Sequence, residues 1–257
     1  MNILRTEGLG IAFGGVVAVH DLDLEIERGK IHAVIGPNGA GKSTVFNLIT
    51  RRYDPTRGRI FMEDRDITGL APHRVVRLGV ARTFQNIRLF PSMTVLENVL
   101  MGYHSKLSGG IWHVFARTKG LREGERRGRE AGMKVLESVG LADKARHYPR
   151  NLPYGEQKLI EVARALISDP KVLLLDEPVA GLNSAEKERM AEFLKTVKSW
   201  GKTMLLIEHS MRTVMKVADR ITVLHHGQKL AEGTPAEIQE HPEVLLAYLG
   251  QRAGWRT

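Results

Sequence analysis

The stretch of sequence that decides the fold reads Gly36-Pro37-Asn38-Gly39-Ala40-Gly41-Lys42-Ser43-Thr44. It fits the pattern G-x-x-x-x-G-K-[ST], in which backbone N–H groups wrap around phosphates. The three glycines allow backbone angles and a close approach that a Cβ atom would prevent. In such a loop the ammonium of Lys42 reaches the β- and γ-phosphates, and the hydroxyl of Ser43 binds Mg²⁺. Residues Gly36 to Thr44 therefore predict a site for ATP with Mg²⁺.

The residues on either side of this loop predict a strand before it and a helix after it. Ile31–Ile35 is a short apolar run typical of a buried strand. One face of the following helix is marked by Val45, Phe46, Leu48 and Ile49. The loop then lies at the N-terminus of a helix, where the helix dipole attracts anions.

Two acids follow a second apolar run. Val172-Leu173-Leu174-Leu175 is typical of a buried parallel strand, and Asp176 and Glu177 come directly after it. Because ligands of parallel α/β sheets bind at the carboxyl ends of the strands, we expect Asp176 beside the Mg²⁺ that Ser43 binds. Glu177 can polarise a water molecule aimed at the γ-phosphate. The alternative is a solvated strand end that carries two acids.

A histidine ends a third apolar run. Thr203–Ile207 predicts a strand, and Glu208 and His209 follow it. A lone histidine is usually structural or merely exposed, but at this position His209 can donate a hydrogen bond to the γ-phosphate as its charge shifts. We interpret the histidines at 73, 104, 147, 225, 226 and 241 as surface residues, and no pair of them has the context of a metal site.

Composition narrows the class of protein. The chain has 257 residues, of which 42% are hydrophobic and 26% charged, and it has no cysteine. No apolar run approaches the about 20 residues that span a bilayer, and the N-terminus lacks the form of a signal peptide. We therefore expect a cytoplasmic protein without disulfides.

The formal charge of +9 suits a polyanionic partner such as ATP, nucleic acid or an anionic membrane surface. The densest basic run lies between Arg117 and Arg129, and its acidic neighbours favour a solvated helix face over an RNA-binding or membrane-binding role. No basic stripe is interleaved with aromatic residues, so no specific nucleic acid partner is expected.

In this order, the motifs resemble those of the nucleotide-binding subunit of an ABC transporter, over almost the whole chain. The resemblance implies that Phe13 stacks on adenine, although Phe13 also suits the core of an N-terminal sheet. It implies that Gln85 senses Mg²⁺ and the γ-phosphate and links to a membrane subunit. Residues 151–158 stand in the place of the family's signature loop, in which Gly155 and Glu156 are expected to contact nucleotide.

The signature implies pairing, because the family binds each ATP between one subunit's phosphate loop and the other's signature. Here Leu152-Pro153-Tyr154-Gly155-Glu156 replaces the usual Leu-Ser-Gly-Gly-Gln, so the serine hydroxyl is missing. Pro153 suits a first helical turn, and we expect the contacts across the pair to come from Gly155 and the helix N-terminus. Leu107-Ser108-Gly109-Gly110 is closer in its letters, but we interpret it as a loop in an insertion.

Further stretches resemble the larger ATP-binding protein of branched-chain amino acid uptake systems. They are Gly181-Leu182-Asn183, the run from Arg88 to Asn98, the segment from Leu107 to Arg122, and the ending from Gly233 to Gly250. The resemblance implies an ATPase on the cytoplasmic side of the cell membrane, attached peripherally to integral membrane permease subunits. A second ATP-binding subunit, identical or homologous, completes the pair, and a periplasmic or extracellular solute-binding protein acts indirectly.

Three alternatives stay open. Related subunits that serve urea uptake or lipopolysaccharide export share several of these motifs. A soluble ABC ATPase that acts on ribosomes or DNA suits the positive charge, although such proteins usually carry two nucleotide domains or a long coiled-coil insertion. A nucleotide-binding module without ATPase activity suits the proline in the signature.

The expected fold class is α/β, a P-loop NTPase (RecA-like) core with an N-terminal antiparallel β-subdomain and an inserted α-helical subdomain. We expect a single ABC ATPase domain over residues 1–250. Its nucleotide-binding core comprises 1–85 and 152–232, its helical lobe 86–151, and residues 233–257 form a helical tail. The apolar positions of this tail, Ile238, Val244, Leu245, Tyr248 and Leu249, are expected to pack on the core.

Overall fold

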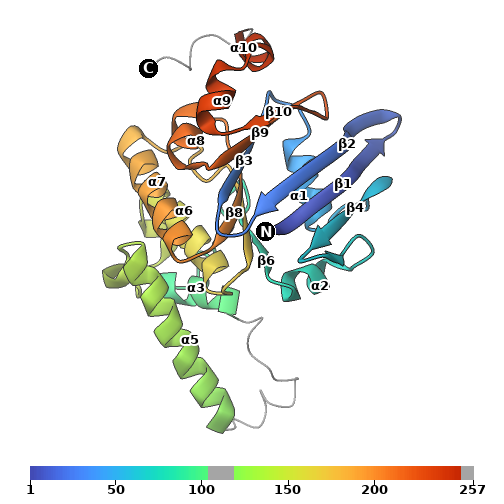
Figure 1. The fold of residues 1–257 in the computed structure, drawn as a ribbon. Coiled ribbons are helices and arrows are strands. Elements are labelled where there is room, and N and C mark those ends of the chain that lie inside the picture. The colour runs from blue at the N-terminus through green and yellow to red at the C-terminus, as the bar shows by residue number, and fades with distance from the viewer. Residues whose placement is uncertain (104–118, 250–257) are drawn as a thin grey trace. The chain divides into compact units, whose positions relative to one another are not determined.

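The computed structural model describes residues 1–103 and 119–249 of the chain. Contacts between residues group the chain into two compact units. The core unit comprises Met1–Val80 and Lys171–Thr257, and the helical unit comprises Ala81–Pro170. Both units are drawn in Figure 1. The expected loop at 107–110 lies outside the described residues.

The boundaries of these units differ from the expected lobe at 86–151. The signature helix α6 (Tyr154–Leu166) packs against the lobe helices α3 (Val95–Tyr103) and α5 (Lys119–Ser138). Contacts between distant parts of the chain therefore place both Gln85 and the signature in the helical unit, although their sequence suggested the core.

The core unit contains an antiparallel sheet with strand order β2-β1-β4-β5, coloured blue to cyan in Figure 1. Its strands are β1 (Asn2–Phe13), β2 (Val16–Glu27), β4 (Arg57–Met62) and β5 (Arg65–Asp66). In β2, Leu22, Leu24 and Ile26 are buried while Asp23 and Glu25 are exposed. This alternation is typical of a half-buried strand in an antiparallel sheet.

A second, mostly parallel sheet has the strand order β10-β9-β3-β8-β7-β6. Its strands are β3 (Ile31–Ile35), β6 (Val80–Arg82), β7 (Val172–Asp176), β8 (Thr203–Ile207), β9 (Arg220–His225) and β10 (Gln228–Gly233). Strands β3, β7 and β8 pair in parallel and every residue in them is buried. Continuous apolar runs form such strands because both faces of a parallel sheet are covered.

The core unit also contains helices that follow its strands along the chain. They are α1 (Lys42–Ile49), α2 (Pro72–Arg77), α7 (Ser184–Ser199), α8 (Met211–Val217), α9 (Pro235–Glu240) and α10 (Pro242–Leu249). The tail packs on the core as expected at Ile238 and Val244, which are 1% and 0% exposed. The side chains of Tyr248 and Leu249 lie outside the described residues.

The helical unit is built around a close contact between α3 and α6. A Cβ atom on Gly102 would lie 1.8 Å from the carbonyl oxygen of Arg164, so the two backbones touch. Two short helical turns, Ala142–Lys144 and Pro149–Asn151, precede α6. On α5, Arg126 pairs with Glu130 at 2.8 Å on an exposed surface, as expected for a solvated helix face.

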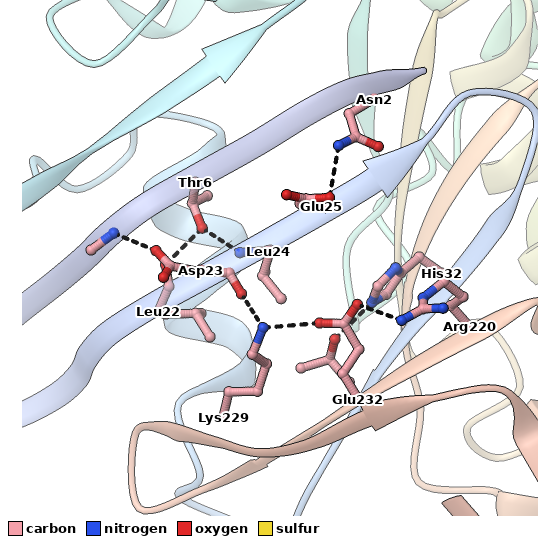
Figure 2. Close-up of polar contacts among 12 residues, drawn as sticks. Asn2, Thr6, Leu22, Asp23, Leu24, Glu25, His32, Arg220, Lys229 and Glu232 are labelled. Atoms are coloured by element: carbon pink, nitrogen blue, oxygen red, sulfur yellow. Dashed lines mark hydrogen bonds and ion pairs between the residues drawn. The ribbon is translucent and has the colours of Figure 1, made fainter. Parts of the chain in front are cut away.

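Polar contacts tie the antiparallel sheet to the parallel sheet within the core unit (Figure 2). The ammonium of Lys229 on β10 donates to the carbonyl oxygen of Asp23 on β2 at 2.9 Å. It also donates to Glu232 at 3.0 Å, and Arg220 pairs with Glu232 at 3.2 Å. These contacts hold the two sheets together, and the phosphate loop follows strand β3 of the parallel sheet.

His32 is the buried member of this junction. It is 1% exposed, and its Nε2 lies 2.8 Å from the hydroxyl oxygen of Thr222 (Figure 2). Burial lowers the pKa of His32 to about 4 from 6.5, against the opposing charge of Glu232. The native state therefore holds the imidazole neutral.

This burial predicts acid sensitivity. A histidine whose pKa is lower in the native state contributes its full stability above its unfolded pKa, and the contribution is lost as pH falls from 6.5 toward 4. From pH 7 to pH 5 we expect His32 to remove about 2 kcal/mol from the free energy of unfolding. Urea denaturation at both pH values measures the loss, which should shrink in His32→Gln. An equal loss in both proteins would contradict this account.

Candidate nucleotide site

The phosphate loop lies between β3 and α1, as predicted. Lys42 begins α1 and is only 6% exposed. Its Nζ donates to the carbonyl oxygens of Gly36 and Pro37 at 2.7 and 2.8 Å, so the ammonium curls back over the loop. The side chain of Ser43, the next residue, is exposed. The loop thus holds a buried cation beside an accessible hydroxyl.

Packing against the sheets explains two of the glycines. Gly36 has a φ of 154°, and a Cβ atom there would lie 2.2 Å from the carbonyl oxygen of Leu224 on β9. Gly41 has a φ of 100°, and its Cβ atom would lie 2.6 Å from the carbonyl oxygen of Ala18 on β2. Both contacts are with backbone, which cannot move aside, so only glycine fits.

Asp176 and Glu177 stand at the end of β7. Asp176 is 5% exposed, and the side chain of Glu177 is 15% exposed. Glu177 has a φ of 50°, and its N–H donates to the carbonyl oxygen of Ile207 at 2.9 Å. The interpretation of these acids as a solvated strand end is therefore wrong. A non-glycine residue with positive φ is uncommon and marks a constrained position.

His209 contacts Glu177 across the ends of β7 and β8. Its Nε2 lies 3.0 Å from Oε1 of Glu177, and 42% of the histidine side chain is exposed. The acid and the histidine, predicted from different strands, form one hydrogen-bonded pair. An exposed imidazole beside a half-hidden carboxylate can donate to a phosphate oxygen while the carboxylate faces a water molecule.

Charges of both signs meet around Lys42. Burial lowers the pKa of Lys42, while the nearby carboxylates of Glu177 and Asp176 raise it. The phosphate loop and the end of β7 therefore form one electrostatic site.

The donor set at this site suits Mg²⁺. Among the described residues, no cluster of three or more His, Cys, Asp or Glu side chains is placed to hold a metal ion. Ser43 and Asp176 instead offer a hydroxyl and a carboxylate, and Mg²⁺ in such sites binds one or two protein oxygens together with substrate phosphates. These residues fit a magnesium ion that arrives with the nucleotide.

Glu208 is a residue of this site whose role the sequence did not reveal. It is 2% exposed, and its carboxylate accepts backbone N–H bonds from Val179 at 2.9 Å, His209 at 3.1 Å and Ser210 at 3.3 Å. Burial raises its pKa, and those N–H donors lower it. Glu208 therefore fastens the loop after Glu177 to the loop that carries His209. The only signal in the sequence is an acid next to His209 at the end of a buried strand.

We expect Glu208→Ala to lower kcat for ATP hydrolysis by about 10- to 100-fold with little change in KM, because supporting contacts set the geometry of reacting groups. Glu208→Gln keeps one acceptor oxygen and should lose less. Steady-state kinetics of both variants, beside Glu243→Gln on the exposed side of α10, measures the effect. Equal kcat values in Glu208→Ala and the wild type would refute the supporting role.

Phe13 ends β1 and is 45% exposed. Its interpretation as a core residue is therefore wrong, and its ring remains a candidate for stacking on adenine. Tyr53, which the sequence did not single out, meets Phe13 edge to face with ring centroids 5.2 Å apart. This contact orients the Phe13 ring, so the pair offers an aromatic surface at the end of β1.

The other predicted residues lie in the helical unit. The side chain of Gln85 is exposed. Pro153 caps α6 without a side-chain hydrogen bond, and Gly155 is buried in the first turn. Glu156 pairs with Lys144 at 2.5 Å. The structure thus brings together Lys42, Asp176, Glu177 and His209 in the core unit, and it places Gln85, Gly155 and Glu156 in the helical unit.

Comparison with protein families decides the class. The model of the ABC transporter family matches residues 19–180, which span the phosphate loop, the signature and the end of β7. The chain belongs to the ABC transporter family. A second family, described as branched-chain amino acid ATP-binding cassette transporter, matches residues 228–254 at the end of this ABC protein.

Curated relatives match this ABC protein over nearly its whole length. The high-affinity branched-chain amino acid transport ATP-binding protein LivG of Salmonella typhimurium is 42% identical over 97% of this chain and 98% of its own. BraF of Pseudomonas aeruginosa, which carries the same description, is also 42% identical over 97% of this chain and 98% of its own. A probable LivG of Archaeoglobus fulgidus is 38% identical over 97% of this chain and 96% of its own.

Solved structures of ABC cassettes confirm the expected P-loop NTPase fold. The ADP conformation of the cassette MJ1267 is similar with a TM-score of 0.85 and 32% identity, over 98% of this chain and 100% of that one. The cassette MJ0796, a dimer with bound ADP and phosphate, gives a TM-score of 0.76 and 25% identity over 90% of this chain and 98% of that one. This family is one of nucleotide-binding ATPases, so the chain is an ATPase of ABC type.

Proposed function

We propose that this ABC ATPase powers the import of branched-chain amino acids across the cytoplasmic membrane. The observation that carries the proposal is the full-length similarity to LivG of Salmonella typhimurium, 42% identical over 97% of the chain. The branched-chain family match at 228–254 adds support from a segment outside the nucleotide site.

Each group of residues in the site has a role in the transfer of the γ-phosphate of ATP to water. The loop from Gly36 to Thr44 binds the phosphates of ATP, and Phe13 stacks on the adenine. Ser43, Asp176 and Gln85 would hold Mg²⁺, which would neutralise charge on the phosphates. Glu177 orients and polarises the attacking water.

Two further groups act on the charge of the γ-phosphate. Lys42 is a fixed cation, since burial and two hydrogen bonds hold it in place. Nε2 of His209 lies 3.0 Å from Oε1 of Glu177, and the same N–H group can donate to a phosphate oxygen instead. Residues of two strand ends therefore stabilise one transition state, and hydrolysis depends on their mutual position.

Membership of the ABC transporter family supports a set of partners for this chain. None of the described helices combines the length and the apolar character that crossing a bilayer requires. We propose that the protein binds integral permease subunits peripherally, on the cytoplasmic side, through the region of Gln85. A second ATP-binding subunit faces the phosphate loop with its own Gly155 and Glu156, and a solute-binding protein delivers the amino acid from outside.

Reconstitution tests this function. The chain is purified from membranes with the integral subunits that accompany it, and the complex is placed in liposomes with ATP. We expect ATP-dependent uptake of radiolabelled leucine, isoleucine or valine, lost in Glu177→Gln. Uptake of urea in place of these amino acids would contradict the proposed substrate. Co-purification with RNA or DNA, in the absence of any integral subunit, would contradict transport itself.

A further inference from the structure

Side chains of the signature helix α6 form hydrogen bonds to backbone carbonyl groups in the segment around Gln85. Lys158 on α6 is 2% exposed, and its Nζ donates to the carbonyl oxygen of Gln85 at 2.7 Å. Arg164, near the end of the same helix, donates to the carbonyl oxygen of Arg88 at 2.5 Å. Two cations of one helix therefore bind the carbonyl groups on either side of residues 86 and 87.

Glu161 lies between these cations in the sequence and completes the contact. It is 2% exposed, and the backbone N–H groups of Phe84 and Arg88 donate to its carboxylate. Its Oε1 also lies 3.6 Å from Nη2 of Arg164. Burial raises the pKa of Glu161, and Lys158 and Arg164 oppose this shift. Burying a carboxylate costs free energy unless hydrogen bonds or opposite charges compensate for the lost water. The two N–H groups and Arg164 provide this compensation for Glu161.

The face of α6 that carries Lys158 and Glu161 begins at Tyr154 in the signature. Residues 154, 158 and 161 follow the i, i+4, i+7 spacing of one helix face. The ring centroid of Tyr154 in the signature lies 5.9 Å from Nζ of Lys158, a distance at which a cation and a ring attract each other. A chain of contacts therefore runs from the signature to the carbonyl group of Gln85.

The far end of the segment is fixed as well. Asn98 on α3 is 0% exposed, and its side chain accepts from the N–H of Phe90 at 2.8 Å and donates to the carbonyl oxygens of Phe90 at 3.0 Å and Met93 at 3.2 Å. Since α3 touches α6 through Gly102, both anchors belong to one rigid pair of helices. The backbone of Gln85 is thus held while its side chain stays exposed.

We propose that Glu161 is a positioning residue that makes the place of Gln85 depend on the signature helix. The proposal rests on the role proposed above for Gln85, as a group that meets Mg²⁺ and the γ-phosphate. A signature that engages nucleotide on a second subunit then sets Gln85 on its own subunit through Lys158, Glu161 and Arg164. Hydrolysis is limited in this way to a chain whose signature is occupied.

A double-mutant cycle tests the proposal on the full-length chain, with MgATP hydrolysis as the readout. We expect Glu161→Gln and Gln85→Ala each to lower kcat about tenfold or more and to leave KM for ATP within about twofold. In the double variant, kcat should equal that of Gln85→Ala, because Glu161 acts only through Gln85. Losses that multiply in the double variant would overturn the proposal.

A structural readout separates positioning from general destabilisation. In Glu161→Gln, hydrogen exchange of the Phe84 and Arg88 amides should be faster by about tenfold or more, because one charged acceptor has been removed. Ile160→Ala is the matched control, since it shortens a buried side chain of the same helix and should leave these amides protected. Unchanged exchange in Glu161→Gln, or equal acceleration in the control, would overturn the proposal.

Arg164→Met is the second variant and serves even where Glu161→Gln does not fold. It removes the donor to Arg88 and the cationic partner of Glu161, and its loss of kcat should disappear in a Gln85→Ala background. A loss that persists there would overturn the proposal. An inactive wild-type chain would refute the proposed function itself, whereas a loss in Gln85→Ala with normal kcat in Glu161→Gln would refute only the positioning.

Discussion

Glu177→Gln is expected to lower kcat for ATP hydrolysis by about 10²- to 10⁴-fold, the range that a positioned general base contributes. The amide keeps the shape of the side chain and can still contact His209, but it cannot take a proton. Lys42 bonds to carbonyl oxygens of the phosphate loop itself, so the Kd for MgATP should stay within about threefold. Single-turnover kinetics and equilibrium binding with a fluorescent ATP analogue measure the two quantities separately.

Glu240→Gln is the matched control for this variant. Glu240 is exposed at the end of α9 in the same unit, and its amide removes the same charge without touching the site. Wild-type turnover in Glu177→Gln would refute the assigned role. Lost binding together with lost turnover would show instead that the acid supports the loop.

Lys42→Ala is expected to abolish function at an earlier step. Hydrogen bonds from a cation to phosphate contribute about 1.5 to 3 kcal/mol, so the Kd for ATP should rise by about 10- to 100-fold. Turnover at saturating ATP should fall as well, because Lys42 also meets the charge that develops on the γ-phosphate. Isothermal titration with ATP and with ADP measures the loss.

The response to ADP sharpens this prediction. Lys42 reaches the β- and γ-phosphates, so we expect a larger loss of affinity for ATP than for ADP. Lys195→Ala on α7 is the matched control, because its side chain is 41% exposed and pairs with the exposed Glu192. Equal affinity for ATP in Lys42→Ala and the wild type would contradict the proposed binding mode.

Local patterns predicted the core of the site because each polar group directly follows a recognisable loop or buried strand. The phosphate loop needs its glycines wherever it occurs, and here Gly36 and Gly41 meet backbone that leaves no room for a Cβ atom. The runs before Asp176 and Glu208 are fully buried strands, and apart from Thr203 at the start of β8 both runs are apolar. The ends of these strands then place the two acids and the histidine at one edge.

Contacts between distant residues set what the sequence did not predict. Glu208 acts through backbone amides of two loops, and no local pattern shows that its carboxylate faces them. Tyr53 approaches Phe13 only because the chain after α1 returns to the end of β1. The same holds for the helical unit, whose boundary depends on how α6 packs against α3 and α5.

The proposed function requires that ATP holds two ATP-binding subunits together. Sedimentation equilibrium of the Glu177→Gln variant tests this requirement directly. The variant is measured without nucleotide, with MgATP and with MgADP, alone and with the ATP-binding subunit that co-purifies with it. We predict a dimer in MgATP, with monomers in MgADP and without nucleotide. A chain that binds MgATP and stays monomeric, both alone and beside that subunit, would contradict the account.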